Sequence, residues 1–326
     1  MLIKKHNHNI GLFIASKIVI IVLLFFSKLS GGNFFGYISY STSNIGDDIQ
    51  ALAAKQFLPE NTIAIDREFI HEFHHEAKVH TIINGWYMWT KNLGWYQSKK
   101  KAPEKSWPPS FVLNPLILSI HFTPGFVSSA LSDEGVEYLK KYSPIGARDY
   151  YTLQELQNKN IPSYFSGCLT LTLENSCKER TDTIYAVDID QECINFIKSK
   201  TGHKIEIVTH HINSSIASNN EKRLKHAQAI LEKYKQAKCV ITSRLHATMP
   251  CLAFQTPVLL LNTSKDQCRF TGLKELVHNC SKKEFIDGLV DFNFNNPPTN
   301  PTTYLSLREN LIKIVTDWIH DKKCDQ

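Results

Sequence analysis

Short apolar runs alternate with amphipathic stretches along the chain from about residue 34 onward. The runs are rich in β-branched and aromatic residues, which is typical of buried strands, and the stretches between them have apolar positions near helical spacing. Such an alternation predicts α/β layers built on parallel sheets. Strands are expected at 34–40, 62–65, 79–83, 116–122 and 162–165, and again at 183–187, 204–208, 239–242 and 257–261.

Amphipathic segments between these strands predict the helices. They are expected at 47–57, 132–141, 152–157, 191–200, 221–236, 245–254 and, at the end of the chain, 304–321. Thr152 and Glu155 have the spacing of a capping box, so a helix is expected to begin just after Asp149. Arg148 is thereby placed at a strand-to-helix turn.

The two series of elements divide the chain into two Rossmann-like domains. The first is expected at 33–168 and the second at 181–300, with a hinge at 169–180 and a C-terminal helical segment at 301–326 that packs back on the body. Ligands of parallel α/β sheets bind at the carboxyl ends of the strands. The site is therefore expected in the cleft between the two domains.

A separate hydrophobic segment occupies residues 1–32. Residues 10–26 are strongly apolar, but Lys17 interrupts them and the stretch is slightly shorter than the roughly 20 residues of a spanning helix. No A-x-A-like cleavage site follows. We expect an uncleaved membrane anchor with membrane contact through residues 10–27. The alternatives are a cleaved signal, or a disordered or packed extension of a cytoplasmic protein.

Composition and charge exclude several classes of function. The 326 residues are 42% hydrophobic and 21% charged, which fits a globular chain with about two domains. The net charge of +6 is spread along the chain without a basic stripe, so no nucleic-acid partner is expected. The eight cysteines include no CxxC pair, and neither GxxxxGK[ST] nor GxGxxG occurs, which disfavours a metal site, a P-loop and a dinucleotide fold.

The segment Ser243-Arg244-Leu245-His246 carries the strongest chemical signal. It follows an apolar strand and opens a helix, where backbone N–H groups and the helix dipole favour a bound anion. Arg244 supplies a bidentate donor, and His246 titrates near neutral pH. Alternatively, both are ordinary exposed residues at a helix start.

Several segments point to one family when they are taken in chain order. They are NIGDDIQ at 44–50, ING at 83–85, GARD at 146–149, SGCLTLTL at 166–173 and VITSRLHATMPCLAFQTPV at 240–258. Together they resemble the polysaccharide pyruvyl transferase family, over roughly residues 34–261. The resemblance implies a fold similar to GT-B glycosyltransferases. It also implies transfer of pyruvate from phosphoenolpyruvate to two sugar hydroxyls as a cyclic ketal, with no bound organic cofactor, and the sequence shows no dedicated metal site.

The resemblance also assigns the donor site. The family's phosphoenolpyruvate-binding residues fall on Arg148, Arg244, Leu245 and His246, beside Ser243. Phosphoenolpyruvate has a phosphate and a carboxylate, so two separated guanidinium groups on opposite sides of a cleft suit it. We expect His246 to contact the phosphate and to transfer a proton.

Residues near the first and third strands are candidates for acceptor binding. Asp47 either caps its helix and offsets the dipole, or orients and deprotonates the acceptor hydroxyl. Asn44, Gly46 and Asn84 are expected to bind substrate near it. Of the adjacent His210 and His211, at most one points into the cleft, and we expect His210 to do so.

The chain departs from the family after the third strand. Many members have a run of glycines there, whereas this chain reads Asn84-Gly85-Trp86-Tyr87. The aromatic residues either form a platform for the acceptor sugar or indicate that acceptor binding has drifted. Two other functions stay open: a GT-B glycosyltransferase that uses a nucleotide sugar, and an inactive glycan-binding protein.

Overall fold

The computed structural model describes residues 33–88, 105–177, 179–262 and 267–324, whose strands form two parallel sheets. The six-stranded sheet has the order β2-β1-β3-β4-β5-β6, and the five-stranded sheet has the order β11-β10-β9-β7-β8. Every pair of neighbouring strands is parallel, which confirms the predicted mixed α/β architecture. The strands are β1 (Phe34–Ser39), β2 (Thr62–Asp66), β3 (Val79–Tyr87), β4 (Leu113–Phe122), β5 (Ile145–Ala147), β6 (Ser163–Phe165), β7 (Ile184–Val187), β8 (Ile205–Val208), β9 (Cys239–Thr242), β10 (Val258–Asn262) and β11 (His278–Ser281).

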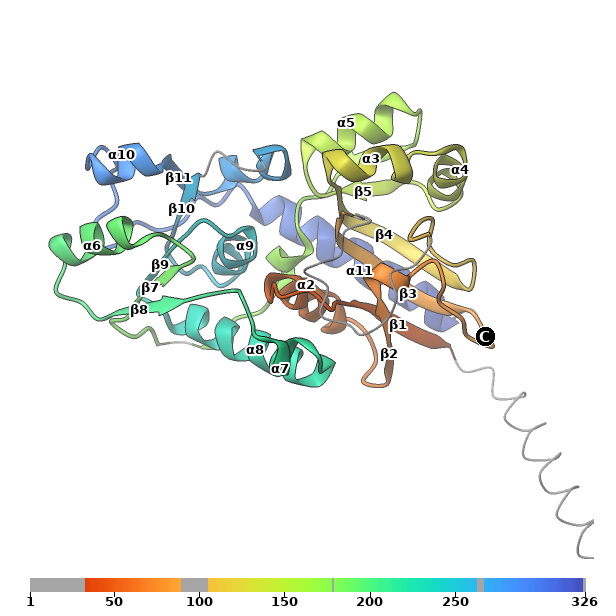
Figure 1. Cartoon of the computed structure of the whole chain (residues 1–326), viewed down its shortest axis with the longest axis horizontal. Helices are drawn as coiled ribbons and strands as arrows, with labels where there is room; N and C mark the ends of the chain where they lie inside the picture. The colour runs from red at the N-terminus through yellow and green to blue at the C-terminus, as the bar shows by residue number, and fades with distance from the viewer. Residues whose placement is uncertain (1–32, 89–104, 178, 263–266, 325–326) are drawn as a thin grey trace, which may run out of the picture.

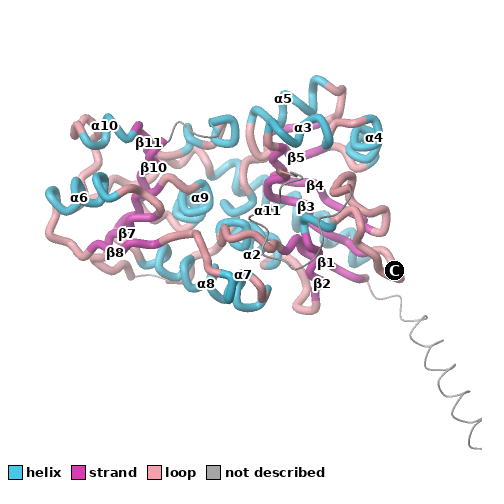
Figure 2. Tube along the Cα trace, viewed as in Figure 1, coloured by secondary structure: helices cyan, strands magenta, loops and turns pink. Residues whose placement is uncertain are grey.

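Helices cover the sheets and fill the space between them (Figures 1 and 2). They are α2 (Gly46–Lys55), α3 (Pro124–Ala130), α4 (Asp133–Lys141), α5 (Tyr150–Asn158), α6 (Gln191–Lys200), α7 (Ser214–Ala217), α8 (Asn220–Gln236), α9 (Leu245–Ala253), α10 (Lys282–Ile286) and α11 (Leu305–Cys324). The sequence pattern did not predict β5, β11, α3, α7 or α10. Each of these is short, and periodicity over so few residues carries little information.

The start of α5 corrects one prediction. The helix does begin directly after Asp149, but Thr152 is not its N-cap residue. Asp149 caps the helix instead, and its carboxylate accepts a hydrogen bond of 2.9 Å from the backbone N–H of Thr152. The cap fixes the backbone next to Arg148, at the carboxyl end of β5.

The largest hydrophobic core lies between the two sheets. Residues of α2, α8, α9 and α11 contribute to it, together with the 3₁₀ turn η2 (Leu169–Thr172), which packs against α2, α9 and α11. Eight of the nine residues of α9 are buried, so this helix has no solvent-facing side. That explains why its sequence lacks an amphipathic pattern. Figure 1 shows α2 and α9 side by side at the centre of the molecule.

The predicted anchor at residues 10–27 lies outside the described residues. Within the part of the chain that the structure describes, no helix combines the length and apolar character needed to cross a membrane.

Candidate active site

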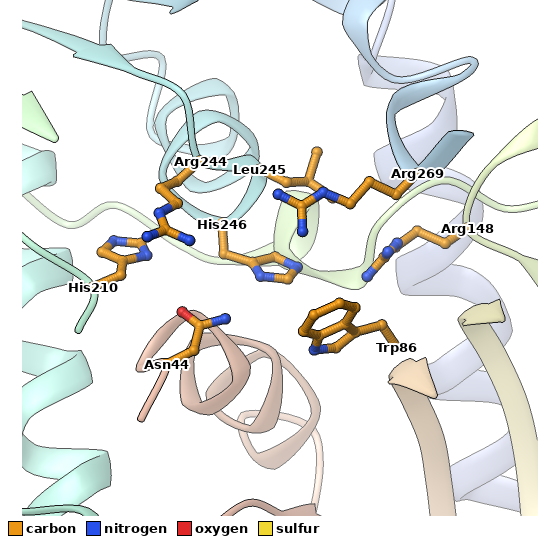
Figure 3. A pocket seen from close by; sticks show the side chains of 8 residues that line it. All are labelled: Asn44, Trp86, Arg148, His210, Arg244, Leu245, His246 and Arg269. Atoms are coloured by element: carbon orange, nitrogen blue, oxygen red, sulfur yellow. The ribbon is translucent and has the colours of Figure 1, made fainter. Parts of the chain in front are cut away.

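Loops at the carboxyl ends of strands from both sheets enclose a pocket. It encloses about 340 Å³ of space, counting its opening to solvent. We call the part of the chain around the six-stranded sheet the first half and the part around the five-stranded sheet the second half. The first half contributes residues that follow β1 and β5 and one near the end of β3. The second half contributes the loop after β8, the start of α9 and the 3₁₀ turn η3 (Gln267–Phe270). The lining residues are Asn44, Trp86, Arg148, His210, Arg244, Leu245, His246 and Arg269 (Figure 3).

Arg244 is held at the pocket edge by the loop after β7. Its Nε donates a hydrogen bond of 2.7 Å to Asp188, and its Nη2 lies 2.7 Å from Nε2 of His211. Burial favours the neutral form of Asp188, but hydrogen bonds from His210 and Thr209 and the charge of Arg244 hold its pKa below the ordinary value. Asp188 is therefore an ionised partner that fixes the direction of the guanidinium.

Arg148 enters the pocket from the opposite half and is almost completely buried, with 1% of its surface exposed. Its Nη1 donates a hydrogen bond of 3.3 Å to Gln50, and its Nε lies 3.7 Å from a carboxylate oxygen of Asp149. Within the described residues, that Nε has no hydrogen-bond acceptor. A buried guanidinium with an unused donor is costly unless an anion completes it.

His246 lies between the two arginines in Figure 3 and is 8% exposed. Burial lowers its pKa well below the ordinary value, and the nearby charges of Arg148, Arg269, His210 and Arg244 act in the same direction. Among the residues that the structure describes, Nε2 of His246 has no hydrogen-bond partner. The ring is therefore neutral near pH 7 and has one nitrogen available for a substrate.

His210 and His211 point to different surroundings, as adjacent residues after a strand were predicted to do. His210 is buried and its Nε2 lies 2.8 Å from the hydroxyl of Tyr234, whereas His211 is exposed. Burial lowers the pKa of His210 to about 4. The pocket is thus bounded by two histidines that are neutral near pH 7.

Gly46 brings the first turn of α2 against these rings. A Cβ added at this position would lie 3.2 Å from Nδ1 of His246, 3.3 Å from Nδ1 of His210 and 3.2 Å from Oδ1 of Asn44. These distances are shorter than ordinary carbon contacts. The absence of a side chain at Gly46 therefore allows both imidazoles to approach the helix.

Comparison of the sequence with known protein families identifies one that matches this chain. The family model described as polysaccharide pyruvyl transferase matches residues 44–265, which is more than half of the chain. The chain belongs to this family. The matched region includes seven of the eight residues that line the pocket of this pyruvyl transferase family member, all but Arg269.

Other comparisons are weaker. A solved structure of a functionally uncharacterised protein from Klebsiella pneumoniae is similar to this family member, with 14% identity and a TM-score of 0.46, over 81% of this chain and 97% of that one. No curated protein matches.

Most of the predicted site residues of this pyruvyl transferase family member meet in the pocket. Asn44, Arg148, His210, Arg244, Leu245 and His246 line it, and Gly46 lies directly against it. Ser243 does not line it, because its hydroxyl donates a hydrogen bond of 2.8 Å to the carbonyl of Asp188. Asn84 also lies elsewhere, where its amide donates a hydrogen bond of 3.0 Å to the carbonyl of Gln50.

Asp47 and Asp48 lie in the first turn of α2, where carboxylates offset the helix dipole as predicted, but the predicted cap is wrong. Neither side chain caps α2, whose N-cap residue is Ile45. Asp47 is fully buried beneath the pocket and does not line it, and Asp48 forms an ion pair with Arg223. The predicted catalytic role of Asp47 therefore has no support in the geometry.

Sequence reasoning missed Arg269 and Asp188. Arg269 lies in the 3₁₀ turn η3, outside the family motifs, and no spacing in the sequence indicates that it reaches the pocket. Asp188 follows β7 with a φ angle of 49°, a left-handed conformation that is uncommon for a residue other than glycine. A polar residue directly after a predicted parallel strand was the signal that could have identified it. Within the described ranges, no three His, Cys, Asp or Glu side chains gather as a metal site would require.

Proposed function

We propose that this family member transfers the pyruvyl group of phosphoenolpyruvate to two hydroxyls of a glycan as a cyclic ketal. The observation that carries the proposal is the meeting of Arg148, Arg244 and Arg269 in one pocket. They come from both halves of the molecule, and guanidinium groups that converge on one pocket favour the binding of an anion there. The family supplies the acceptor class, a polysaccharide.

The donor suits this arrangement because it has two anionic groups. Arg148, with its unused Nε, and Arg244, aimed by Asp188, are two separate guanidinium donors. We assign one to the phosphate and the other to the carboxylate, with Arg269 as a third positive group. Planar guanidinium groups bind both kinds of anion through paired hydrogen bonds.

His246 is assigned the proton transfers. Its neutral ring has an available Nε2, which accepts a proton from the first acceptor hydroxyl and delivers one to the methylene carbon of the donor. The hydroxyl oxygen bonds to the enol carbon as the methylene becomes a methyl group. The bond from that carbon to the phosphate oxygen then breaks, the second hydroxyl closes the ketal, and its proton leaves with the phosphate.

The arrangement of the chain belongs to the same proposal. We assign 33–168 and 181–300 to the two domains of a GT-B-like fold, joined at 169–180, with the donor in the cleft between them. Two parallel sheets with a pocket at their carboxyl ends support this assignment. No bound cofactor is required, since the donor carries the group to be transferred.

Mass spectrometry tests the proposal directly. The protein is incubated with phosphoenolpyruvate and a panel of glycans, and each glycan is examined for the mass of one pyruvyl ketal while released phosphate is measured. Formation of both products in equal amounts is the expected result. Thermal stabilisation by nucleotide sugars but not by phosphoenolpyruvate would favour a glycosyltransferase, and glycan binding without phosphate release would indicate an inactive binding protein.

A further inference from the structure

Three side chains, those of Asp47, Trp86 and Arg269, contact one another in sequence across the pocket. The indole Nε1 of Trp86 on β3 donates a hydrogen bond of 2.7 Å to Oδ1 of Asp47 on α2. On the other side of the indole, the guanidinium carbon of Arg269 lies 5.8 Å from the centre of the ring. Trp86 and Arg269 both line the pocket, whereas Asp47 does not.

The surroundings of Asp47 suit a positioning residue. Its side chain is fully buried, and Oδ1 also lies 3.4 Å from the amide nitrogen of Gln50. The other oxygen, Oδ2, accepts a hydrogen bond of 2.9 Å from Thr42 and lies 3.8 Å from Nη1 of Arg67. Both carboxylate oxygens are therefore occupied by donors within the protein, and neither is directed at a hydroxyl in the pocket.

Trp86 is fixed at two points. Asp47 holds its indole nitrogen, and Arg67 donates a hydrogen bond of 3.0 Å to its backbone carbonyl. Tyr87, the next residue, points the opposite way into the core, where its ring lies 5.2 Å from that of Trp107. The alternation of a strand thus presents Trp86 alone to the pocket, in one orientation.

The position of Arg269 decides which substrate Trp86 serves. A sugar ring stacked between the indole and the guanidinium would need a gap of about 7 Å, twice the closest favourable carbon contact. The distance of 5.8 Å is too short for that and is within the range of a cation–π contact. That side of the indole is therefore used to hold a cation and not to stack a sugar.

Resting on the function proposed above, we propose that Asp47 and Trp86 are positioning residues for the donor. The carboxylate fixes the indole, and the indole face holds the Arg269 guanidinium toward the phosphate or carboxylate of phosphoenolpyruvate. Trp86 is then not an acceptor platform, and Asp47 is not the general base. A substitution in this series of contacts changes the affinity for the anionic donor and leaves the affinity for the acceptor unchanged.

Two substitutions of Trp86 separate its two contacts. Trp86→Gln keeps an N–H donor for Asp47 and removes the aromatic face, so the KM for phosphoenolpyruvate should rise by about tenfold while the KM for the acceptor stays constant. Trp86→Phe keeps a face and removes the donor, and its effect should be smaller, about threefold. Trp318→Gln is the matched control, because Trp318 is partly buried on α11 against Phe35 and His80 and does not line the pocket.

Coupling and proton transfer are measured with three more variants. Arg269→Ala should raise the KM for phosphoenolpyruvate about as much as Trp86→Gln does, and the double variant should be no worse than Arg269→Ala alone. Asp47→Asn keeps an oxygen that accepts from the indole but turns its NH₂ toward Thr42 and Arg67, so the KM for phosphoenolpyruvate should rise about threefold while the pH profile of kcat keeps its wild-type shape. A rise in the acceptor KM alone, additive effects of Trp86→Gln and Arg269→Ala, or a hundredfold loss of kcat in Asp47→Asn would each overturn the proposal.

Binding of inorganic phosphate tests the positioning role independently of the proposed reaction. Calorimetry on the full chain should show weaker phosphate binding in Trp86→Gln and unchanged binding in Trp318→Gln. If that holds while the wild type releases no phosphate from phosphoenolpyruvate, the proposed reaction is wrong and the anion-positioning role stands. If Trp86→Gln binds phosphate as the wild type does, the positioning role is wrong whatever the reaction. A wild-type protein without measurable phosphate affinity contradicts both.

Discussion

Arg223 on α8 and Asp48 on α2 form a buried bidentate ion pair that joins the two halves of the molecule. Nε of Arg223 lies 2.9 Å from Oδ1 of Asp48 and Nη2 lies 2.6 Å from Oδ2, and both side chains are almost completely buried. The remaining nitrogen, Nη1, donates to the backbone carbonyl of Thr42. Because Asp48 is two residues from Gly46, the pair fixes α2 beside the pocket.

Removal of one partner of this pair should be strongly destabilising. Arg223→Met leaves the Asp48 carboxylate buried without a cation, and we expect a loss of about 3–5 kcal/mol in the free energy of unfolding. Urea unfolding measures it. Lys283→Met, which removes the exposed partner of Asp287, is the control and should leave the unfolding midpoint unchanged. A midpoint for Arg223→Met equal to that of the wild type would show that the ion pair does not hold the halves together.

Loss of Arg148 or of Arg244 should weaken donor binding without unfolding the protein. Arg148→Ala and Arg244→Ala each remove hydrogen bonds to an anion, so the Kd for phosphoenolpyruvate should rise roughly 10- to 100-fold. Calorimetry gives the Kd, and circular dichroism checks the fold. Arg308→Ala is the control, because Arg308 donates to the carbonyls of Leu171 and Leu173 away from the pocket. Wild-type affinity in both pocket variants would remove these residues from the donor site.

His246→Gln should separate binding from turnover. Glutamine retains a polar side chain in the pocket but cannot shuttle a proton, so kcat should fall by at least about a hundredfold while the Kd for phosphoenolpyruvate changes about threefold or less. Steady-state kinetics and calorimetry on the same preparation provide both values. Equal losses in kcat and in affinity would limit His246 to a binding role.

Gly46→Ala should reduce activity more than stability. Its new methyl group would crowd Nδ1 of both His246 and His210, at 3.2 and 3.3 Å, and displace the rings that border the pocket. We expect kcat/KM to fall about tenfold, which corresponds to about 1.4 kcal/mol in the transition state. Gly125→Ala is the control, since a Cβ there meets no atom within 4 Å. Equal activity in the two variants would show that the approach of α2 to the imidazoles is not needed.

Stability should decrease as the pH falls below about 6.5. The folded pKa of His246 is well below its ordinary value, and burial lowers that of His210 to about 4. Between these pKa values and an unfolded pKa of about 6.5, the unfolded chain binds more protons than the folded protein does. Each histidine therefore lowers the free energy of unfolding by up to about 1.4 kcal/mol for every unit by which the pH falls. Burial also lowers the pKa of His121, which adds to the effect.

One carboxyl group opposes this trend. Burial raises the pKa of Asp48 to about 6, which is above the ordinary pKa of an aspartate. As the pH falls from about 6 toward that ordinary pKa, the folded state binds a proton more readily than the unfolded chain, and this carboxyl group adds to the stability. Three histidines outweigh one carboxyl, and the net slope should remain positive between pH 5 and 6.5. Urea unfolding of the wild type and of His246→Gln at pH 5, 6 and 7.5 measures it. The slope should be smaller in the variant, and an equal slope would mean that His246 is protonated in the folded protein.

The sequence by itself predicted much of this molecule because its signals are local. Short, continuously apolar runs identify β1 and β9, since strands that are buried in parallel sheets have this pattern. Arg148 and Arg244 could be placed at the carboxyl ends of their strands because the turn that follows a parallel strand always lies at that edge. The family motifs then indicated that these two arginines share a ligand.

Only the tertiary structure decided which of these side chains face the pocket. Asp47 and Gly46 are adjacent in the sequence, yet one lies beneath the floor and the other directly against two imidazoles, because successive residues of a helix point about 100° apart. Arg269 reaches the pocket from the short 3₁₀ turn η3, and no periodicity in the sequence determines where so short a turn packs. Its contact with Trp86 joins residues 183 positions apart. A contact of that kind depends on how the two sheets are placed, which the packing of the whole core determines and no local pattern specifies.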